Sequence, residues 1–179
     1  TRYEPNRHPD LDFPTSQLLF DIWGDSFGNR QGRHYSPGVA YLDGQRPSIV
    51  MGRGYAGGQS GHPRRVALAA WNFRGGVLTP LWQVATVGGS GAHSAVVGDL
   101  DGDGRDEIVY GQVWVRHDGT LIDRPTWGHG DALHVSQMDP DRAGQMVFMP
   151  HESPGSYGPN ALSVDDGVSG QLVAGVQGS

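Results

Sequence analysis

The stretch VVGDLDGDGRDEIVYG, residues 96 to 111, places an apolar run on each side of a short turn rich in aspartate and glycine. Two other segments have the same order, VAYLDGQRPSIVM (39 to 51) and LHVSQMDPDRAGQMVFM (133 to 149). The turn dipeptides that align are Asp43-Gly44, Asp101-Gly102 and Asp139-Pro140. They lie 58 and 38 residues apart, so the sequence predicts one structural unit built three times.

Each unit is followed by a second apolar, turn, apolar segment. These segments are RVALAAWNFRGGVLTPLWQ, QVWVRHDGTLID and NALSVDDGVSGQLVAG. Their turns, Arg74-Gly75-Gly76, Asp118-Gly119 and Asp166-Gly167, are hairpin signals, because glycine supplies the positive φ that tight turns need. No helical apolar period continues beyond about ten residues. Each repeat therefore predicts four short antiparallel strands.

Four strands repeated every 40 to 50 residues or so are typical of β-propeller blades. We expect an all-β fold with an irregular N-terminal arm over residues 1–35 and about three to four blades over residues 36–179. Three blades cannot close a ring of roughly four to eight. Either the arm completes a fourth blade or the chain is part of a larger propeller, and we favour the second interpretation. A partial propeller predicts self-association or pairing with the missing blades.

Composition excludes several classes of partner and mechanism. The formal net charge of −6 argues against nucleic acid as a partner. All 13 basic residues are arginine, and cysteine is absent, so the chain offers neither a lysine base nor thiol chemistry. No stretch approaches membrane-spanning length, so no membrane partner is expected. The N-terminus TRYEPNRHPD lacks an apolar signal region, and the signal of an exported form would already have been removed.

The acidic turn has the spacing of a calcium-binding loop. The predicted ligands are the carboxylates of Asp99, Asp101, Asp103 and Glu107 and the backbone carbonyl of Arg105. Gly102 and Gly104 allow the chain to wrap tightly around an ion. The alternative is a solvated turn without metal. Because so many neighbouring carboxylates repel one another, a bound cation is the favoured interpretation. The two sibling turns retain fewer acids and are expected to be metal-free or weak.

A second set of histidines and acids lies next to the predicted strands. It consists of His93, His129, Asp131 and Glu152. Equivalent ends of neighbouring blades converge on one face, so these side chains are expected to form a metal or polar-ligand site. The alternative is a group of separate surface residues. Trp127, next to this group in sequence, is the tryptophan expected to face a ligand, whereas the others are expected to pack between strands.

Five segments together resemble the rhamnogalacturonan lyases of polysaccharide lyase family 11. They are WGDSFGNR (23 to 30), VAYLDGQRPSIVMGRGY (39 to 55), LAAWNFRGGVLTPLW (68 to 82), GDLDGDGRDEIVYG (98 to 111) and GHGDALHVSQMDP (128 to 140). The resemblance implies a partial chain, or a short divergent form, of an eight-bladed propeller enzyme. Such an enzyme cleaves rhamnogalacturonan I, an acidic polysaccharide of pectin, and binds Ca²⁺ in blade loops and at the active site.

The resemblance also assigns roles to residues outside the acidic loop. It implies that His93, His129, Asp131 and Glu152 bind a calcium ion near the substrate. It places Arg53 and Tyr55, in the GRGY stretch, at the substrate. The implied reaction is a β-elimination, in which the C5 proton of a galacturonate is removed and the O4-linked sugar leaves. No residue of this chain is identified as the catalytic base.

Two functions are therefore carried forward. The first is a secreted, calcium-assisted rhamnogalacturonan I lyase, or a part of one, whose isolated chain need not be active. The alternative is a non-catalytic, calcium-stabilised propeller module that binds carbohydrate or protein. The acidic loop suits both functions, whereas the histidine set is needed only for the first.

Overall fold

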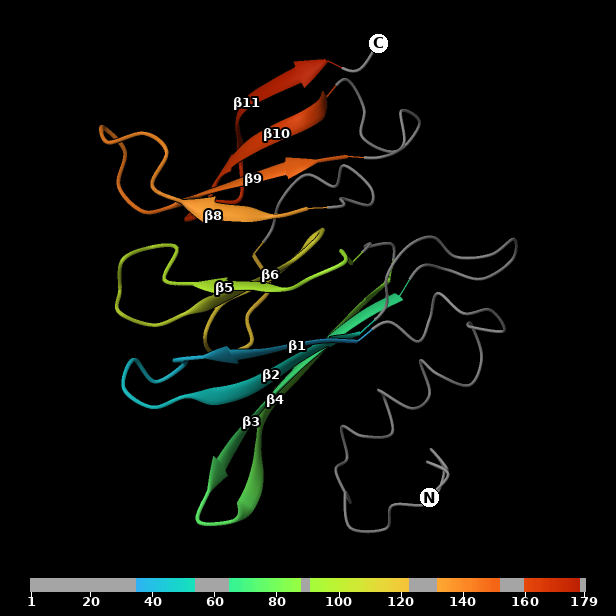
Figure 1. Cartoon of the computed structure of the whole chain (residues 1–179), viewed down its shortest axis with the longest axis vertical. Coiled ribbons are helices and arrows are strands. Elements are labelled where there is room, and N and C mark those ends of the chain that lie inside the picture. Colours follow the sequence, from blue (N-terminus) through green and yellow to red (C-terminus); the bar gives the residue numbers. More distant parts are fainter. Residues whose placement is uncertain (1–34, 54–64, 88–90, 123–131, 152–159, 178–179) are drawn as a thin grey trace.

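The described residues form three antiparallel β-sheets (Figure 1). The computed structural model describes residues 35–53, 65–87, 91–122, 132–151 and 160–177. Every regular element in these ranges is a strand, so the all-β prediction is confirmed for this part of the chain. The described residues include no helix long and apolar enough to span a bilayer. Apart from its last residue, the predicted arm over 1–35 lies outside the described residues.

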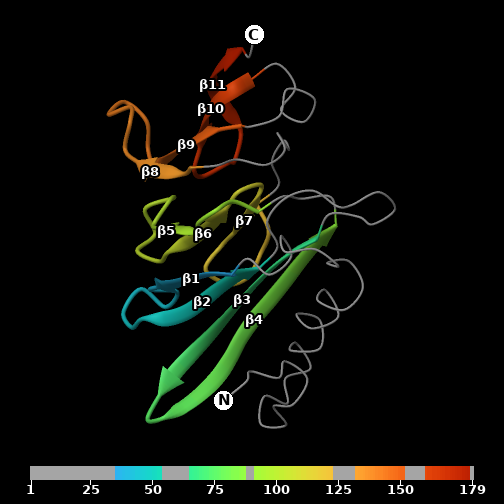
Figure 2. The same cartoon turned by 45° about the vertical axis from the view of Figure 1, so that its right-hand side comes forward.

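The first sheet contains four strands whose spatial order follows the sequence. They are β1 (Tyr35–Ala40), β2 (Ser48–Arg53), β3 (Arg65–Arg74) and β4 (Val77–Val87). The β3–β4 hairpin turns at Gly75 and Gly76, both with positive φ, as predicted. Figure 2 shows this long hairpin reaching past the rest of the sheet.

The third sheet also has four strands in sequence order. They are β8 (His134–Ser136), β9 (Met146–Pro150), β10 (Asn160–Asp166) and β11 (Leu172–Gln177). The predicted turn after Asp166 is present, but the glycine with positive φ is Gly170, at +72°, and not Gly167. Gly167 is required for a different reason, because a Cβ there would lie 2.4 Å from the carbonyl oxygen of Gln145.

The middle sheet differs from the predicted four strands. It has three, β5 (Val96–Gly98), β6 (Glu107–Tyr110) and β7 (Val113–Val115), and among the described residues the fourth is reduced to a bridge between Val115 and Leu121. The apolar run after the turn is only Leu121-Ile122, which is too short to extend the pairing. The four-strand prediction is therefore wrong for the described part of this repeat.

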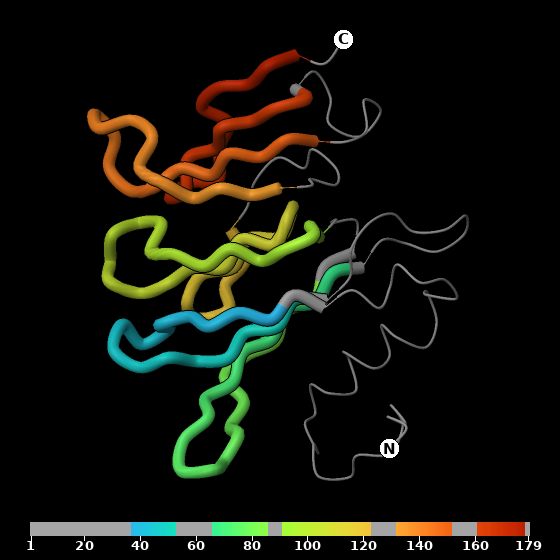
Figure 3. The backbone as a smooth tube through the Cα atoms, viewed as in Figure 1, coloured from blue at the N-terminus to red at the C-terminus, as the bar shows by residue number. Residues whose placement is uncertain are grey.

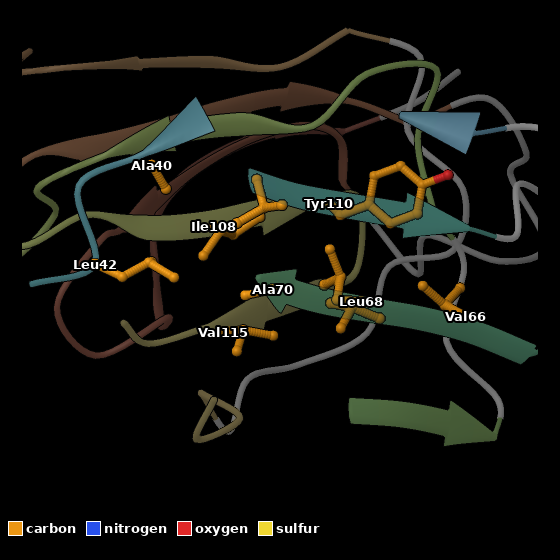
Figure 4. Packing of buried hydrophobic residues seen from close by; sticks show 10 residues of the cluster. Ala40, Leu42, Val66, Leu68, Ala70, Ile108, Tyr110 and Val115 are labelled. Carbon is orange, nitrogen blue, oxygen red and sulfur yellow. The ribbon is translucent and has the colours of Figure 1, made fainter. Parts of the chain in front are cut away.

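The three sheets stack in sequence order with the middle sheet between the other two (Figure 3). β1 lies beside β5, and β5 lies beside β8. Alternate residues of β6 face opposite sheets. Ile108 and Tyr110 pack against the first sheet (Figure 4), whereas Val109 joins Trp114 in a second cluster with residues of the third. Burial on both faces explains the continuous apolar runs of the middle repeat.

The three aspartate turns lie at the same end of the stack, on the left in Figure 1. Each one connects the first two strands of its sheet. The strand pairs that enclose the turns end at Ala40↔Ser48, Gly98↔Glu107 and Ser136↔Met146. Glu107, Ser48 and Met146 are therefore structurally equivalent, and all three are buried.

Backbone hydrogen bonds join neighbouring turns. The N–H of Asp106 donates to the carbonyl of Tyr41 (3.2 Å), and the N–H of Gln145 donates to the carbonyl of Leu100 (2.8 Å). Both donors directly precede the second strand of a sheet, and both acceptors belong to the turn of the preceding sheet. The turns thus fix the relative positions of successive sheets.

Candidate metal site

The loop between β5 and β6 folds around the carboxylate of Asp99. Its two oxygens accept hydrogen bonds from the N–H groups of Gly102 (2.8 Å) and Gly104 (3.0 Å). Both glycines have positive φ, +79° and +86°, which side chains with a Cβ rarely adopt. The loop is therefore tightly wound at these glycines, and wrapping around an ion stays a prediction.

Glu107, the first residue of β6, provides the buried acid of the site. Its side chain is 0% exposed, and Oε2 accepts a hydrogen bond from the N–H of Leu100 at 2.9 Å. Within the described part of the chain, Oε1 is buried without a hydrogen-bond partner. Burial raises the pKa of Glu107; the Leu100 amide opposes this shift, and the Asp101 charge adds to it. A buried carboxylate oxygen without a partner is costly, and a cation would satisfy it.

In the described part of the chain, two groups of three side chains could hold a metal ion, and Glu107 belongs to both. In each group the candidate ligand atoms lie within 4.8 Å of one another. The groups are Asp99, Asp101 and Glu107, and Asp103, Glu107 and His117. The structure therefore places the four predicted carboxylates in two groups that share Glu107.

Arg105 has contacts of a kind that the sequence does not predict. Its N–H donates to Asp103 Oδ1 at 2.8 Å, and its guanidinium lies 2.9 Å from His117 Nε2. Calcium ligation through the backbone carbonyl of Arg105 stays a prediction.

His117 is the site residue that the sequence interpretation missed. Its Nδ1 lies 3.6 Å from Glu107 Oε1 and 3.8 Å from Asp103 Oδ2. The available signal was the short hairpin of β6 and β7, in which Ile108 pairs with Val115. Continuing that antiparallel register carries the residues after β7 back to the acidic loop.

Arg116, the residue before His117, connects the loop to the third sheet. One guanidinium nitrogen lies 3.0 Å from Asp101 Oδ2, and the other donates to the carbonyl of Val168 at 3.2 Å. The guanidinium compensates part of the negative charge of the loop. Its contacts also tie the acidic loop to the turn between β10 and β11.

In the sibling turns, an arginine approaches the aspartate that aligns with Asp101. Arg46 Nε lies 3.0 Å from Asp43 Oδ2, and Arg142 Nε lies 3.4 Å from Asp139 Oδ2. The positions equivalent to Glu107 hold serine and methionine, so these turns lack the buried carboxylate. Among the described residues, no group of three candidate ligands forms at either turn.

The second predicted set is described only in part. His93 is exposed just before β5, whereas Asp99 follows the opposite end of that strand. Arg53 ends β2 and pairs with Tyr35 through the backbone. The remaining predicted residues lie outside the described part of the chain: Tyr55, Trp127, His129, Asp131 and Glu152. Their roles stay predictions.

A buried polar chain supports the end of β9, directly before Glu152. His151 Nε2 lies 3.0 Å from Ser163 Oγ, which donates to Asp165 Oδ2 at 3.1 Å. All three residues are buried. Because an ionised carboxylate only accepts, the Ser163 hydroxyl proton goes to Asp165, and His151 Nε2–H donates to Ser163 Oγ. These two hydrogen bonds fix the orientation of the His151 ring.

Comparisons with known proteins agree with these observations. The chain is 44% identical over 161 residues to the rhamnogalacturonan exolyase YesX of Bacillus subtilis (strain 168). It is 43% identical over 162 residues to the rhamnogalacturonan endolyase YesW of the same organism. Each match covers 86% of this chain. The crystal structure of rhamnogalacturonan lyase YesW superimposes with a TM-score of 0.77 at 40% identity, covering 93% of this chain and 28% of that one.

The chain spans about a quarter of the length of these curated relatives, 25% of YesX and 24% of YesW. Residues 10–179 match the family model for the C-terminal domain of rhamnogalacturonan lyase family 11. The resemblance inferred from the sequence motifs is thereby confirmed. The chain belongs to rhamnogalacturonan lyase family 11.

Proposed function

We propose that this chain is part of a lyase that cleaves rhamnogalacturonan I by calcium-assisted β-elimination at galacturonate. The observation that carries the proposal is the match of residues 10–179 to a domain of this lyase family. Both curated relatives are rhamnogalacturonan lyases, one an exolyase and the other an endolyase. The exolyase and the endolyase are nearly equally similar to this chain, at 44% and 43% identity.

We further propose that the three sheets are blades of a larger, eight-bladed propeller. The stacking of sheets through their first strands, β1, β5 and β8, supports this arrangement. The outer sheets also expose apolar side chains, including Val39 at 59% and Val176 at 58%. Val39 alternates with the buried Ala40 and so faces away from the middle sheet. Additional blades, or a second copy of the chain, would cover such surfaces.

The loop over residues 99–107 is proposed as a structural calcium clip. Asp99, Asp101 and Glu107 offer hard carboxylate oxygens, the ligands that Ca²⁺ prefers. The buried oxygen of Glu107 supports a cation at this place. The contacts of Asp106 with the first sheet and of Arg116 with the turn of the third would transmit the stabilisation to both neighbours.

A second calcium position is proposed near the substrate, with His93, His129, Asp131 and Glu152 as ligands. The start of β5 and the end of β9 lie at the end of the stack opposite the acidic turns, which supports a site separate from the clip. The hydrogen bonds that link His151, Ser163 and Asp165 would restrain the backbone directly before Glu152. A calcium ion bound there would neutralise a galacturonate carboxylate and make the C5 proton more acidic.

The proposed partner is the acidic backbone of rhamnogalacturonan I, with Arg53, Tyr55 and Trp127 as substrate contacts. An acidic chain of net charge −6 needs cationic groups at the sugar site, and both arginine and bound calcium provide them. A secreted location is proposed because the substrate is extracellular. The catalytic base is not assigned to any residue of this chain.

The test combines binding and cleavage. The purified chain is incubated with rhamnogalacturonan I oligosaccharides in calcium and then in chelator. Binding is measured by calorimetry, and unsaturated product is measured by ultraviolet absorbance. We expect calcium-dependent binding that His129→Ala weakens and that His134→Ala, at an exposed position in β8, leaves unchanged.

The two readouts separate the candidate functions. A calcium-dependent rise in absorbance would place a complete lyase site within the chain. Binding without product would favour a non-catalytic module, or a part that needs the rest of the enzyme. A folded protein that neither binds nor cleaves the oligosaccharides would refute the proposal.

A further inference from the structure

The acidic loop offers two donor sets of different chemistry. Asp99, Asp101 and Glu107 offer only oxygen, whereas the second group adds an imidazole nitrogen from His117 to the oxygens of Asp103 and Glu107. Imidazole with carboxylate suits borderline ions such as Zn²⁺, Co²⁺ and Mn²⁺, whereas Ca²⁺ prefers oxygen. We propose that Asp103, Glu107 and His117 form a separate position for such an ion, adjoining the calcium position and sharing Glu107. This proposal does not depend on lyase activity.

Two buried polar atoms without hydrogen-bond partners in the described part of the chain support a metal ion at this position. Glu107 Oε1 and His117 Nδ1 are both buried, and within the described residues neither has a hydrogen-bond partner. They lie 3.6 Å apart, too far for a hydrogen bond between them. Two ligands bound about 2.1 Å from a tetrahedral ion are separated by about 3.4 Å. A small adjustment of the two side chains would therefore bring both atoms to ligand distance.

Arg105 competes with the metal for His117. Its NH1 group lies 2.9 Å from His117 Nε2, and because a guanidinium only donates, Nε2 must accept. The neutral ring then carries its proton on Nδ1. Ligation through Nδ1 needs the lone pair of that nitrogen, so the proton moves to Nε2, the ring stays neutral, and no proton is lost to solvent. The resulting Nε2–H cannot accept a hydrogen bond from Arg105. The exposed Arg105 side chain must then move away.

The turn that carries His117 is held in place by the first sheet. Trp82 Nε1 donates to the carbonyl of His117 at 2.8 Å. The turn also approaches the indole closely, since a Cβ at Gly119 would lie 2.8 Å from Trp82 Cγ. His117 is therefore positioned before an ion arrives, and little conformational freedom would be lost on binding.

The test uses Co²⁺, whose visible absorption changes when nitrogen joins the ligand set. Parent, His117→Gln and His134→Gln are titrated with Co²⁺, while Ca²⁺ binding is measured separately by calorimetry. His134 is an exposed histidine outside the cluster and serves as the matched control. We expect His117→Gln to weaken Co²⁺ binding about tenfold or more and to leave Ca²⁺ affinity nearly unchanged, with His134→Gln like the parent. Arg105→Ala should strengthen Co²⁺ binding about two- to tenfold, the value of one hydrogen bond.

The proposal is overturned if His117→Gln binds Co²⁺ with the affinity and spectrum of the parent. A protein that binds Co²⁺ through His117 but shows no response to Ca²⁺ would support this position while refuting the calcium clip. The converse result, with Ca²⁺ bound and Co²⁺ insensitive to His117, would refute only the position proposed here.

Discussion

Tyr41 and Asp106 form a reciprocal pair between the first and middle sheets. The N–H of Tyr41 donates to Asp106 Oδ2 at 2.6 Å, and the N–H of Asp106 donates to the carbonyl of Tyr41 at 3.2 Å. Asp106 is the one loop acid that the calcium interpretation leaves without a ligand role. In the structure, the Asp106 carboxylate instead accepts a hydrogen bond from the turn of the first sheet. It thereby joins two repeats that are distant in sequence.

Replacing Asp106 by alanine should lower the free energy of unfolding by about 1 to 3 kcal/mol, because the Tyr41 amide loses a charged acceptor. Asp106→Asn retains an acceptor and should lose less. Denaturant unfolding with and without chelator measures both. Asp141→Ala, at an exposed acid of the third turn, is the control. Equal stability of Asp106→Ala and this control would show that the pair contributes nothing.

Glu107→Gln should separate the cost of the buried charge from the benefit of a bound ion. In chelator, the variant should be at least as stable as the parent, because a neutral amide is cheaper to bury than an unpaired carboxylate. In calcium, the parent should gain about 2.7 kcal/mol at a free concentration of 100 times Kd, and the variant should gain little. Thermal unfolding at fixed protein concentration measures both effects. A variant with the full calcium response would remove Glu107 from the ligand set.

Acid should destabilise the turn between β1 and β2 in a defined pH range. The N–H of Arg46, and then that of Gln45, lower the pKa of Asp43 from 3.8 to about 2. Because the folded-state pKa is the lower one, the associated stability is complete above pH 3.8 and is lost as the pH falls toward about 2. Asp43→Asn removes this dependence. An NMR titration of Asp43 that gave an ordinary carboxyl pKa would contradict the geometry of the turn.

The middle sheet should dominate global stability. Ile108→Ala removes a fully buried side chain between two sheets and should cost about 2 to 5 kcal/mol. Val77→Ala, at a position 62% exposed, should change the free energy of unfolding by less than about 0.5 kcal/mol. Chemical denaturation of both variants checks the difference. Similar losses would mean that β4 is covered in solution, as self-association would require.

Local signals in the sequence were sufficient to predict the three repeats and the acidic loop between β5 and β6. Alternation of apolar runs with Asp-Gly turns predicted the hairpins, and the spacing of the loop acids predicted that Asp99 and Asp101 on one side, and Asp103 on the other, gather beside Glu107. Both properties depend on residues close together in the chain. The same local signal overestimated the middle repeat, where Leu121-Ile122 supports one bridge and no strand among the described residues.

Contacts between distant residues could not be predicted in the same way. His117 reaches Glu107 because β7 returns beside β6, and Asp106 reaches Tyr41 because two sheets stack. Neither relationship leaves a motif in the sequence. Gly167 resembles an ordinary turn glycine, yet it is required by the proximity of the Gln145 carbonyl, which only the stacked structure reveals.

The hydrogen bonds between successive turns have a direction. Asp106 and Gln145, each directly before the second strand of its sheet, donate to the preceding turn, but the equivalent residue of the first sheet is Pro47. Proline has no N–H, so this sheet receives the bond from its successor and cannot pass one backward. A sheet packed against the other face of β1–β4 would lack this backbone hydrogen bond. Among the described sheets, the bonds between turns therefore form a one-way series that ends at Pro47.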